Sequence, residues 1–188
     1  THIVKGIAAS QLRVGAKVEA VFAKGKNPPS TIMAIDHFRP LVAQTSEYEF
    51  GKTYDQLEVG MSASFSKTIS ESDIYMFAGI TGDFNPMHVN EDFAKTTPFG
   101  TRIAHGGLPQ SLIANVLGTK LPGLGTVAVE VTVRYKKPTF IGDTITARAE
   151  VAKKLPEKRW VEMELTWTNQ KGEVVSDGRV LVIPPPEM

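Results

Sequence analysis

The sequence has no cysteine, no excess of either charge and no long apolar run. Without cysteine, disulfides, thiol nucleophiles and thiolate-bound metals are excluded. Lysine and arginine number 21 against 20 aspartate and glutamate residues, so no broad field favours nucleic acid or an anionic membrane. No apolar run approaches the ~18 residues of a membrane span, and the N-terminal segment THIVKGIAAS lacks the apolar core of a signal peptide. We expect a cytoplasmic protein that binds neither nucleic acid nor membrane.

A chain of 188 residues is long enough for one well-formed core and one extension. The segment QLRVG at 11–15 is nearly repeated as QLEVG at 56–60, an offset of 45 residues. The two segments are either generic lead-ins to a strand or the trace of a partial duplication. We expect an N-terminal extension of unclear role at 1–50 and one main domain at 51–188.

Four segments in the second half of the chain alternate apolar and polar side chains with a period of two. They are 127–135, 144–151, 161–167 and 174–183. This period is typical of a strand with one face on a core, so the odd-numbered side chains of the first three segments are expected to point inward. Short links, including a turn at 169–172, predict an antiparallel sheet, and 62–69 is expected to be its opening strand.

Helical signals lie between the opening strand and the other four. Ser70 and Asp73 resemble a capping box for a helix that Gly79 is expected to end. Residues 79–88 are expected to form a loop, and 90–95 a short helix. The segment 107–117 is apolar nearly all round, as in a buried helix. One buried helix followed by antiparallel strands predicts an α+β protein with the hot-dog fold, in which the sheet wraps around a central helix.

Acid/base chemistry is concentrated in the segment GDFNPMH, residues 82–88. It places a carboxylate, Asp83, five positions before an imidazole, His88. Asp-Phe-Asn-Pro is also ordinary turn chemistry, and a single histidine in such a turn is often without a catalytic role. From these residues alone, an acid/base pair and a plain turn are both open.

Three motifs taken together are more specific than this segment alone. TGDFNPMHVNEDFA, RIAHGGLPQSL and KKPTFIGDTI, in this order, resemble the MaoC-like, (R)-specific enoyl-CoA hydratases over residues 52–183. The resemblance implies that 51–188 is a MaoC-like hot-dog hydratase domain, which adds water to trans-2-enoyl-CoA and also runs the reverse dehydration. Asp83 and His88 would hold the water, and the backbone N–H of Gly106 would donate to the thioester oxygen. The resemblance also implies a homodimer, no metal, and no cofactor, since the coenzyme A thioester is the substrate.

The same resemblance assigns supporting positions around the pair. Asn85 is expected to shape the loop or to orient the imidazole, and His105 to fix the loop rather than act as a base. Gly107 stands where a larger apolar residue is common and is expected to enlarge the acyl pocket. Ser111 is either structural or lines the site, and Ala114 replaces a hydroxyl residue that some relatives carry.

The coenzyme A contacts and the exact activity are open at this point. Arg134, Lys136 and Lys137 either reach the phosphates of coenzyme A or form a solvated strand edge. Two other functions fit the same fold: a thioesterase, which attacks the thioester carbonyl with water, and an inactive module that binds acyl-CoA or mediates assembly. The acyl-chain length and the pathway, from polyester-precursor supply to fatty-acid metabolism, are also open.

Overall fold

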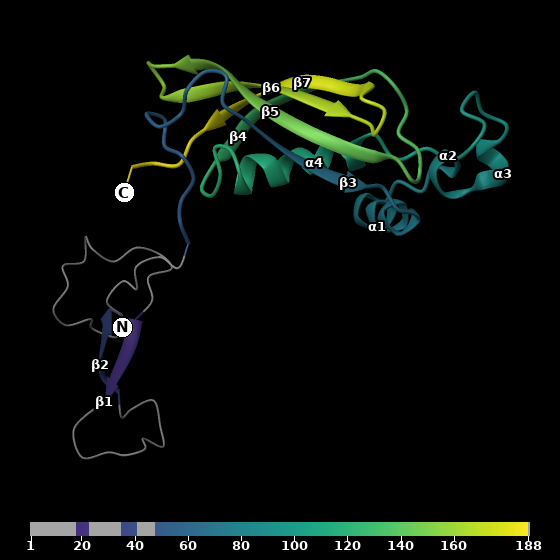
Figure 1. Cartoon of the computed structure of the whole chain (residues 1–188). Coiled ribbons are helices and arrows are strands. Elements are labelled where there is room, and N and C mark those ends of the chain that lie inside the picture. Colours follow the sequence, from purple (N-terminus) through teal and green to yellow (C-terminus); the bar gives the residue numbers. More distant parts are fainter. Residues whose placement is uncertain (1–17, 23–34, 41–47, 188) are drawn as a thin grey trace. The chain divides into compact units, whose positions relative to one another are not determined.

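The chain folds into two compact units, residues 1–49 and 50–188, which are described separately. The structure is a computed structural model that describes residues 18–22, 35–40 and 48–187 (Figure 1). In the first unit, β1 (Val18–Phe22) pairs antiparallel with β2 (Ile35–Pro40). The QLRVG segment lies outside the described residues, so both interpretations of the repeat stay predictions. The role of the N-terminal extension stays open.

The second unit is built on a five-stranded sheet in which every neighbouring pair of strands is antiparallel. The strand order is β3-β5-β6-β7-β4, so β3 and β4 are the two edges. The bounds are β3 (Ser62–Thr68), β4 (Val127–Tyr135), β5 (Thr144–Leu155), β6 (Trp160–Thr168) and β7 (Val174–Ile183). The antiparallel sheet expected from the alternating sequence is confirmed.

The core lies between this sheet and α4 (Gly107–Thr119), which runs along one face of the sheet (Figure 1). Alternate side chains of β5 and β6 are buried, and α4 packs against β3, β5 and β6. Burial of each large apolar side chain contributes about 1.5–3 kcal/mol. The largest buried side chains of β5 and β6 are Ile145, Val151, Val161, Met163, Leu165 and Trp167. The helix-and-sheet arrangement of the hot-dog fold is confirmed.

The helix α4 is less buried than its nearly all-apolar sequence predicts. Leu112, Val116 and Leu117 are buried, but Ser111 and Ala114 lie on an exposed side. The helix is therefore buried along one face and not all round, because the sheet covers it from one direction. Within the described ranges, no helix has both the length and the apolar character needed to cross a membrane.

The core side of β4 departs from the expectation. A β-bulge between Ala128 and Glu130 shifts the register against β7, so the odd-numbered side chains share one face only from Val131 onward. Val131 lies opposite the buried Val180 and therefore on the core side, yet it is 51% exposed, and Tyr135 is 62% exposed. The predicted burial is wrong here because α4 lies over β3, β5 and β6 rather than over β4.

The helix α1 (Glu71–Thr81) begins with the capping box that the sequence predicts. The Asp73 N–H donates to the Ser70 hydroxyl at 3.2 Å, and the Ser70 N–H donates to the Asp73 carboxylate at 2.8 Å. The predicted end at Gly79 is wrong. The helix continues and stops at Gly82, whose φ of 75° is a left-handed conformation that glycine adopts readily.

The loop after α1 is shorter than predicted. α2 (Pro86–Val89) occupies the end of the expected loop, and α3 (Glu91–Ala94) confirms the short helix expected next. Pro86 stands in the first turn of α2, where its missing N–H removes no helical hydrogen bond. Only four residues, 82–85, therefore separate α1 from α2.

Gly178 permits the close pairing of β7 with β4. A Cβ at this position would lie 2.0 Å from the carbonyl oxygen of Thr132. Gly178→Ala therefore forces the two strands apart, and we expect the free energy of unfolding to fall by about 1–3 kcal/mol, as in other overpacked sites. Denaturant unfolding measures this change.

Gly79→Ala is the matched control for Gly178→Ala. Nothing lies within 4 Å of a Cβ at Gly79, which is inside α1. Alanine should stabilise the helix there by about 1 kcal/mol. If both substitutions destabilised the protein equally, the close approach of Thr132 would not explain the loss.

Candidate active site

Asp83 and Asn85 organise the loop between α1 and α2. The Asn85 N–H donates to the Asp83 carboxylate at 3.1 Å, and the Met87 N–H donates to the Asn85 side-chain oxygen at 3.2 Å. Asn85 is thereby the N-cap of α2, and its carbonyl accepts from the His88 N–H at 2.9 Å. Asn85 thus shapes the loop that carries both Asp83 and His88.

His88 is buried, and one hydrogen bond determines its tautomer. Its Nδ1 lies 2.8 Å from the carbonyl oxygen of Ile103. A carbonyl only accepts, so Nδ1 carries the proton and the neutral imidazole keeps its lone pair on Nε2. The backbone at Ile103 therefore holds the ring and leaves Nε2 free to act as an acceptor or a base.

His105 is tied to the same loop through the opposite ring nitrogen. Its Nε2–H donates to the Asp83 carbonyl at 2.9 Å, so its lone pair is on Nδ1. The ring lies between His88 and Phe77, with centroid distances of 4.0 Å and 5.2 Å. The hydrogen bond holds the backbone that carries Asp83, which supports a role for His105 in fixing the loop.

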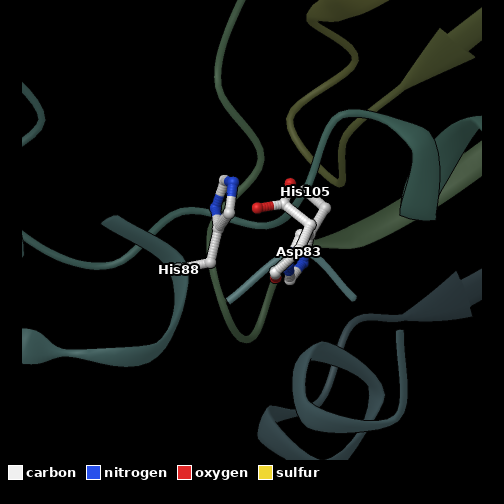
Figure 2. Close-up of side chains that lie close together, drawn as sticks. All are labelled: Asp83, His88 and His105. Atoms are coloured by element: carbon white, nitrogen blue, oxygen red, sulfur yellow. The ribbon is translucent and has the colours of Figure 1, made fainter. Parts of the chain in front are cut away.

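Asp83, His88 and His105 lie close together (Figure 2). One carboxylate oxygen and one nitrogen from each ring lie within 4.8 Å of one another. A water that donates both hydrogens over ~2.8 Å bonds joins two acceptors about 4.5 Å apart. This limit allows one water to be held between the Asp83 carboxylate and the His88 imidazole, whose free lone pair is on Nε2, with the lone pairs of the water directed away from both.

Gly106 follows His105 directly and is the N-cap of α4. In the described part of the chain its N–H donates to no backbone carbonyl, whereas the N–H groups of Ala104 and Leu108 donate to Thr139 and His105. Free N–H groups and the helix dipole make a helix N-terminus suited to negative charge. Gly106 is therefore placed to donate to an oxygen on which charge develops.

Tyr135 of β4 covers Gly106. A Cβ at Gly106 would lie 2.5 Å from the Tyr135 ring, so any larger residue here would require this ring to move. Both residues line a pocket of about 480 Å³, together with Ile103, whose carbonyl holds His88. The pocket adjoins the acid/base pair through Gly106 and Ile103, and neither Asp83 nor His88 lines it.

Lys136 and Lys137 line the same pocket. Lys136 pairs with Asp177 at 2.8 Å and Lys137 pairs with Glu173 at 2.6 Å, while Arg134 lies 3.0 Å from Asp177. Ion pairs of this exposure contribute only ~0–1 kcal/mol, so a phosphate can replace the carboxylates at little cost. These pairs fit a phosphate contact and a solvated strand edge equally well.

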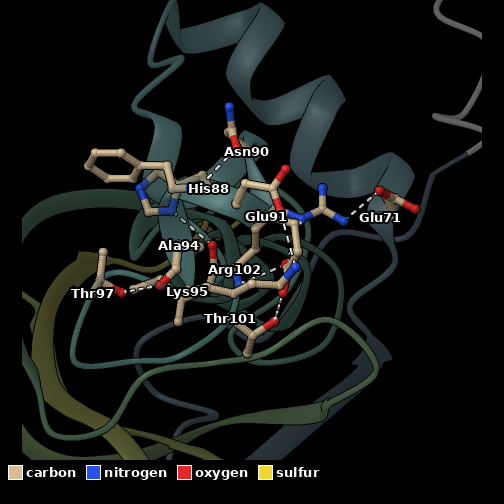
Figure 3. Close-up of polar contacts among 12 residues, drawn as sticks. Glu71, His88, Asn90, Glu91, Ala94, Lys95, Thr97, Thr101 and Arg102 are labelled. Carbon is tan, nitrogen blue, oxygen red and sulfur yellow. Dashed lines mark hydrogen bonds and ion pairs between the residues drawn. The ribbon is translucent and has the colours of Figure 1, made fainter.

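Arg102 links the helices that flank the site (Figure 3). Its Nη2 donates to Glu71 of α1 at 2.6 Å, and its Nε donates to Glu91 of α3 at 3.3 Å. Glu91 also accepts from the Thr101 hydroxyl at 2.9 Å and from the Arg102 backbone N–H at 3.2 Å. The next residue supplies the carbonyl that accepts from His88. This network therefore holds the segment on which the His88 tautomer depends.

Glu91 links the stability of this network to pH. Hydrogen bonds from the Thr101 hydroxyl and the Arg102 N–H hold the pKa of Glu91 below its ordinary value of 4.5, against an opposing effect of desolvation. A carboxyl whose pKa is lowered by folding stabilises the folded state above its unfolded pKa. That contribution is lost as the pH falls through the folded value.

We therefore expect Glu91→Gln to lower the melting temperature at pH 7 and to have less effect at about pH 3, where a larger fraction of the wild-type carboxyl is protonated than at pH 7. Thermal unfolding of both proteins at the two pH values measures the difference. The same loss at both pH values would show that the charge of Glu91 contributes nothing.

The remaining predicted positions lie along α4. A Cβ at Gly107 would lie 3.0 Å from Cζ of Phe77, so the Phe77 ring packs closely against this position. The expected enlargement of the acyl pocket stays a prediction. The hydroxyl of Ser111 donates to the Leu108 carbonyl at 2.7 Å, which supports its structural interpretation. Ala114 is exposed and brings no hydroxyl to the acid/base pair.

Three residues of the site belong to no motif that marks them in the sequence. Tyr135 is one of several alternating strand residues, and Phe77 is one of several apolar residues of α1. Arg102 opens the RIAHGG segment, and this position is the only hint of its role. Their contacts with Gly106, His105 and the glutamates depend on the tertiary fold.

Comparison with known families decides the ancestry of this site. Residues 55–172, well over half of the chain, match the family model of the MaoC like domain. The chain belongs to the MaoC-like domain family. This MaoC-like protein is 50% identical over 132 residues to the (R)-specific enoyl-CoA hydratase of Rhodospirillum rubrum, which covers 70% of this chain and 91% of that protein. It is 47% identical over 129 residues to the 3-hydroxybutyryl-CoA dehydratase of Methylorubrum extorquens, covering 69% of this chain and 82% of that protein.

Solved structures of R-hydratases share the fold of this MaoC-like protein. R-hydratase PhaJ1 from Pseudomonas aeruginosa matches with a TM-score of 0.69 and 39% identity, over 73% of this chain and 88% of that one. The (R)-hydratase from A. caviae involved in PHA biosynthesis matches with a TM-score of 0.67 and 36% identity, over 69% of this chain and 98% of that one. Asp83, His88, His105 and Gly106 all lie inside the family match.

Proposed function

We propose that this MaoC-like protein is an (R)-specific enoyl-CoA hydratase, which adds water to trans-2-enoyl-CoA and catalyses the reverse dehydration. The observation that carries the proposal is the spacing of the Asp83 carboxylate from the His88 imidazole, whose free lone pair is on Nε2. The similarity to an (R)-specific enoyl-CoA hydratase and to a 3-hydroxybutyryl-CoA dehydratase supports the two directions of the reaction.

The water held by Asp83 and His88 is the nucleophile. It donates one hydrogen bond to each residue, so a lone pair of its oxygen is free to attack C3 of the enoyl group. As the bond from oxygen to C3 forms, one of the two residues takes a proton from the water. The C2=C3 electron pair forms a C1=C2 bond, and the carbonyl electron pair moves onto the thioester oxygen. When the carbonyl forms again, C2 takes up a proton that balances the one taken from the water, and the addition is complete. General acid/base assistance of this kind contributes ~10²–10⁴-fold in rate.

Gly106 stabilises the charge that develops on the thioester oxygen. Its N–H has no carbonyl partner among the described residues, and it begins the helix α4. The donor and the helix dipole are in place before the reaction, so no reorganisation is needed when charge appears. One such donor is typically worth ~10²–10³-fold in rate.

Crotonyl-CoA tests the proposal, because loss of the enoyl absorbance and release of free thiol report different reactions. We expect the enoyl absorbance to fall without release of thiol. Thiol release would instead indicate a thioesterase. Binding of acyl-CoA without either change would indicate an inactive binding module.

We further propose a homodimer that pairs through β4. β4 is an edge strand, so one side of its backbone is unpaired within the sheet. The core-side residues Val131 and Tyr135 are exposed in the single chain. An edge strand with apolar side chains is a template for pairing with another strand. A second copy of β4 would continue the sheet and cover both side chains, next to the pocket at Gly106.

Size-exclusion chromatography with light scattering tests this assembly. We expect twice the mass of one chain for the wild type and the mass of one chain for Val131→Lys. Thr132→Lys places the same charge on the opposite face of β4 and should leave the dimer intact, since Thr132 pairs with Arg179 on the outer face. A monomeric wild type would exclude the dimer.

The proposed location of the enzyme is the cytoplasm. Similarity to hydratases that act on coenzyme A thioesters supports this location. Fractionation of the source cells with antibody detection tests it, and recovery in a membrane or secreted fraction would exclude it.

A further inference from the structure

One buried polar atom beside the acid/base pair has no partner. His105 donates from Nε2 to the Asp83 carbonyl, which leaves the lone pair on Nδ1. That nitrogen is buried without a hydrogen bond, in a ring that is 2% exposed. An unsatisfied buried acceptor is unfavourable and rare in folded proteins. The free lone pair therefore indicates a ligand that the chain itself does not supply.

Two further side chains with free lone pairs lie close to the His105 ring (Figure 2). His88 is bonded through Nδ1 to the Ile103 carbonyl, so its Nε2 is free. Asp83 is exposed, and its carboxylate accepts a hydrogen bond from the Asn85 N–H. One ligand-type atom from each of the three side chains lies within 4.8 Å of the other two.

Both histidines have the support that metal ligands usually have. A ligating histidine normally donates its other ring N–H to a carbonyl or a carboxylate, which fixes the ring and its tautomer. His88 donates to Ile103, and His105 donates to the backbone of Asp83. Two imidazole nitrogens and one carboxylate oxygen are a donor set for Zn²⁺ and similar cations, with a fourth position open.

The three ligand atoms can reach the spacing of a tetrahedral site if each pair closes by at most about 1.5 Å. Metal–ligand bonds of ~2.0–2.1 Å place tetrahedral ligand atoms about 3.3 Å apart. The described atoms, within 4.8 Å, must therefore approach one another by part of that difference. Asp83 is the exposed member, so rotation of its side chain can bring its carboxylate closer to the two imidazole rings.

We propose that Asp83, His88 and His105 form a binding site for a divalent transition cation, represented by Zn²⁺, and that the bound cation inhibits the enzyme. The inhibition rests on the proposed function, because the cation takes the lone pairs of Asp83 and His88 that hold the water. The binding itself rests on the geometry alone. The cation is therefore a reversible inhibitor at the position of the water and not a resident cofactor.

Calorimetric titration of the metal-free protein with ZnCl₂ tests the binding. We expect one Zn²⁺ per chain and no binding of Mg²⁺, which prefers oxygen ligands. His105→Gln keeps an N–H at the position of Nε2 and has no ligand atom at Nδ1. It should weaken Zn²⁺ binding at least about tenfold, because even the loss of a group that only hydrogen-bonds to a metal ligand lowers metal affinity ~10–100-fold.

Asp92→Asn is the control for the titration. Asp92 is an exposed carboxylate of α3 that pairs with Lys95 outside the cluster, so its loss should leave the affinity unchanged. Thermal unfolding checks that both variants are folded. The proposed site is overturned if the wild type does not bind Zn²⁺, or if His105→Gln binds Zn²⁺ as tightly as the wild type. It is also overturned if His105→Gln and Asp92→Asn lose affinity for Zn²⁺ equally.

Crotonyl-CoA hydration at the same Zn²⁺ concentrations tests the inhibition. We expect the rate to fall with a midpoint near the calorimetric dissociation constant and to recover when a chelator is added. Binding of Zn²⁺ with an unchanged rate would overturn the inhibitory role. A metal-free protein without hydratase activity would instead refute the proposed function, and the calorimetry would still decide whether the site exists.

Discussion

Asp83→Asn and His88→Asn are each expected to slow crotonyl-CoA hydration by ~10²–10⁴-fold, the range for loss of general acid/base assistance. Asparagine at position 83 keeps a side-chain oxygen for the Asn85 N–H but does not take a proton. Asparagine at position 88 can place an N–H where Nδ1 donates to the Ile103 carbonyl, and it has no atom at Nε2. Each substitution therefore keeps the bonds of the loop and removes one base.

Steady-state kinetics measure the effect, together with circular dichroism and melting temperatures to check the fold. The loss should be in kcat, because both residues act on the water and not on the coenzyme A group. Asp92→Asn, in the next short helix, is the control and should keep the full rate. Full activity in either Asp83→Asn or His88→Asn would refute the acid/base roles.

Gly106→Pro is expected to lower kcat by ~10²–10³-fold more than Gly106→Ala does. Proline removes the N–H that is proposed to donate to the thioester oxygen, and the φ of −55° at Gly106 is one that proline adopts. Alanine keeps the N–H, but its Cβ would lie 2.5 Å from the Tyr135 ring. Because proline has the same Cβ, the comparison separates the donor from the steric effect.

The steric effect has a control of its own. The atoms that a Cβ at Gly106 would meet belong to the outer end of Tyr135. Tyr135→Ala combined with Gly106→Ala should therefore restore most of the rate lost in Gly106→Ala, and Tyr135→Ala should not rescue Gly106→Pro. Equal rates for the alanine and proline variants would show that the Gly106 N–H is not a donor.

The sequence predicts those features that depend on neighbours along the chain. The capping box needs only Ser70 and Asp73, and the buried faces of β5 and β6 follow from strict alternation. The pair of Asp83 and His88 is also local, because the loop that joins them is stabilised by its own side chains. These signals were sufficient for the fold and for the position of the candidate site.

Features that depend on distant residues are not contained in such local patterns. His105 contacts the Asp83 carbonyl across 22 positions, and Arg102 reaches Glu71 across 31. Alternation in β4 predicts that its valines are buried but does not identify the element that covers them. The helix α4 does not cover them, because it packs against β3, β5 and β6. Gly79 and Gly82 are both possible helix ends by composition, and the left-handed φ at Gly82 distinguishes them only in the structure.

The stereochemistry of crotonyl-CoA hydration is the most direct test of the central claim, that the Asp83/His88 pair performs (R)-specific addition of water. The product is hydrolysed, and the 3-hydroxybutyrate is resolved by chiral chromatography for the wild type and for Asp83→Asn. We predict the (R) enantiomer alone from the wild type and no more than background from the variant. An (S) or racemic product, or undiminished formation by Asp83→Asn, would contradict the claim.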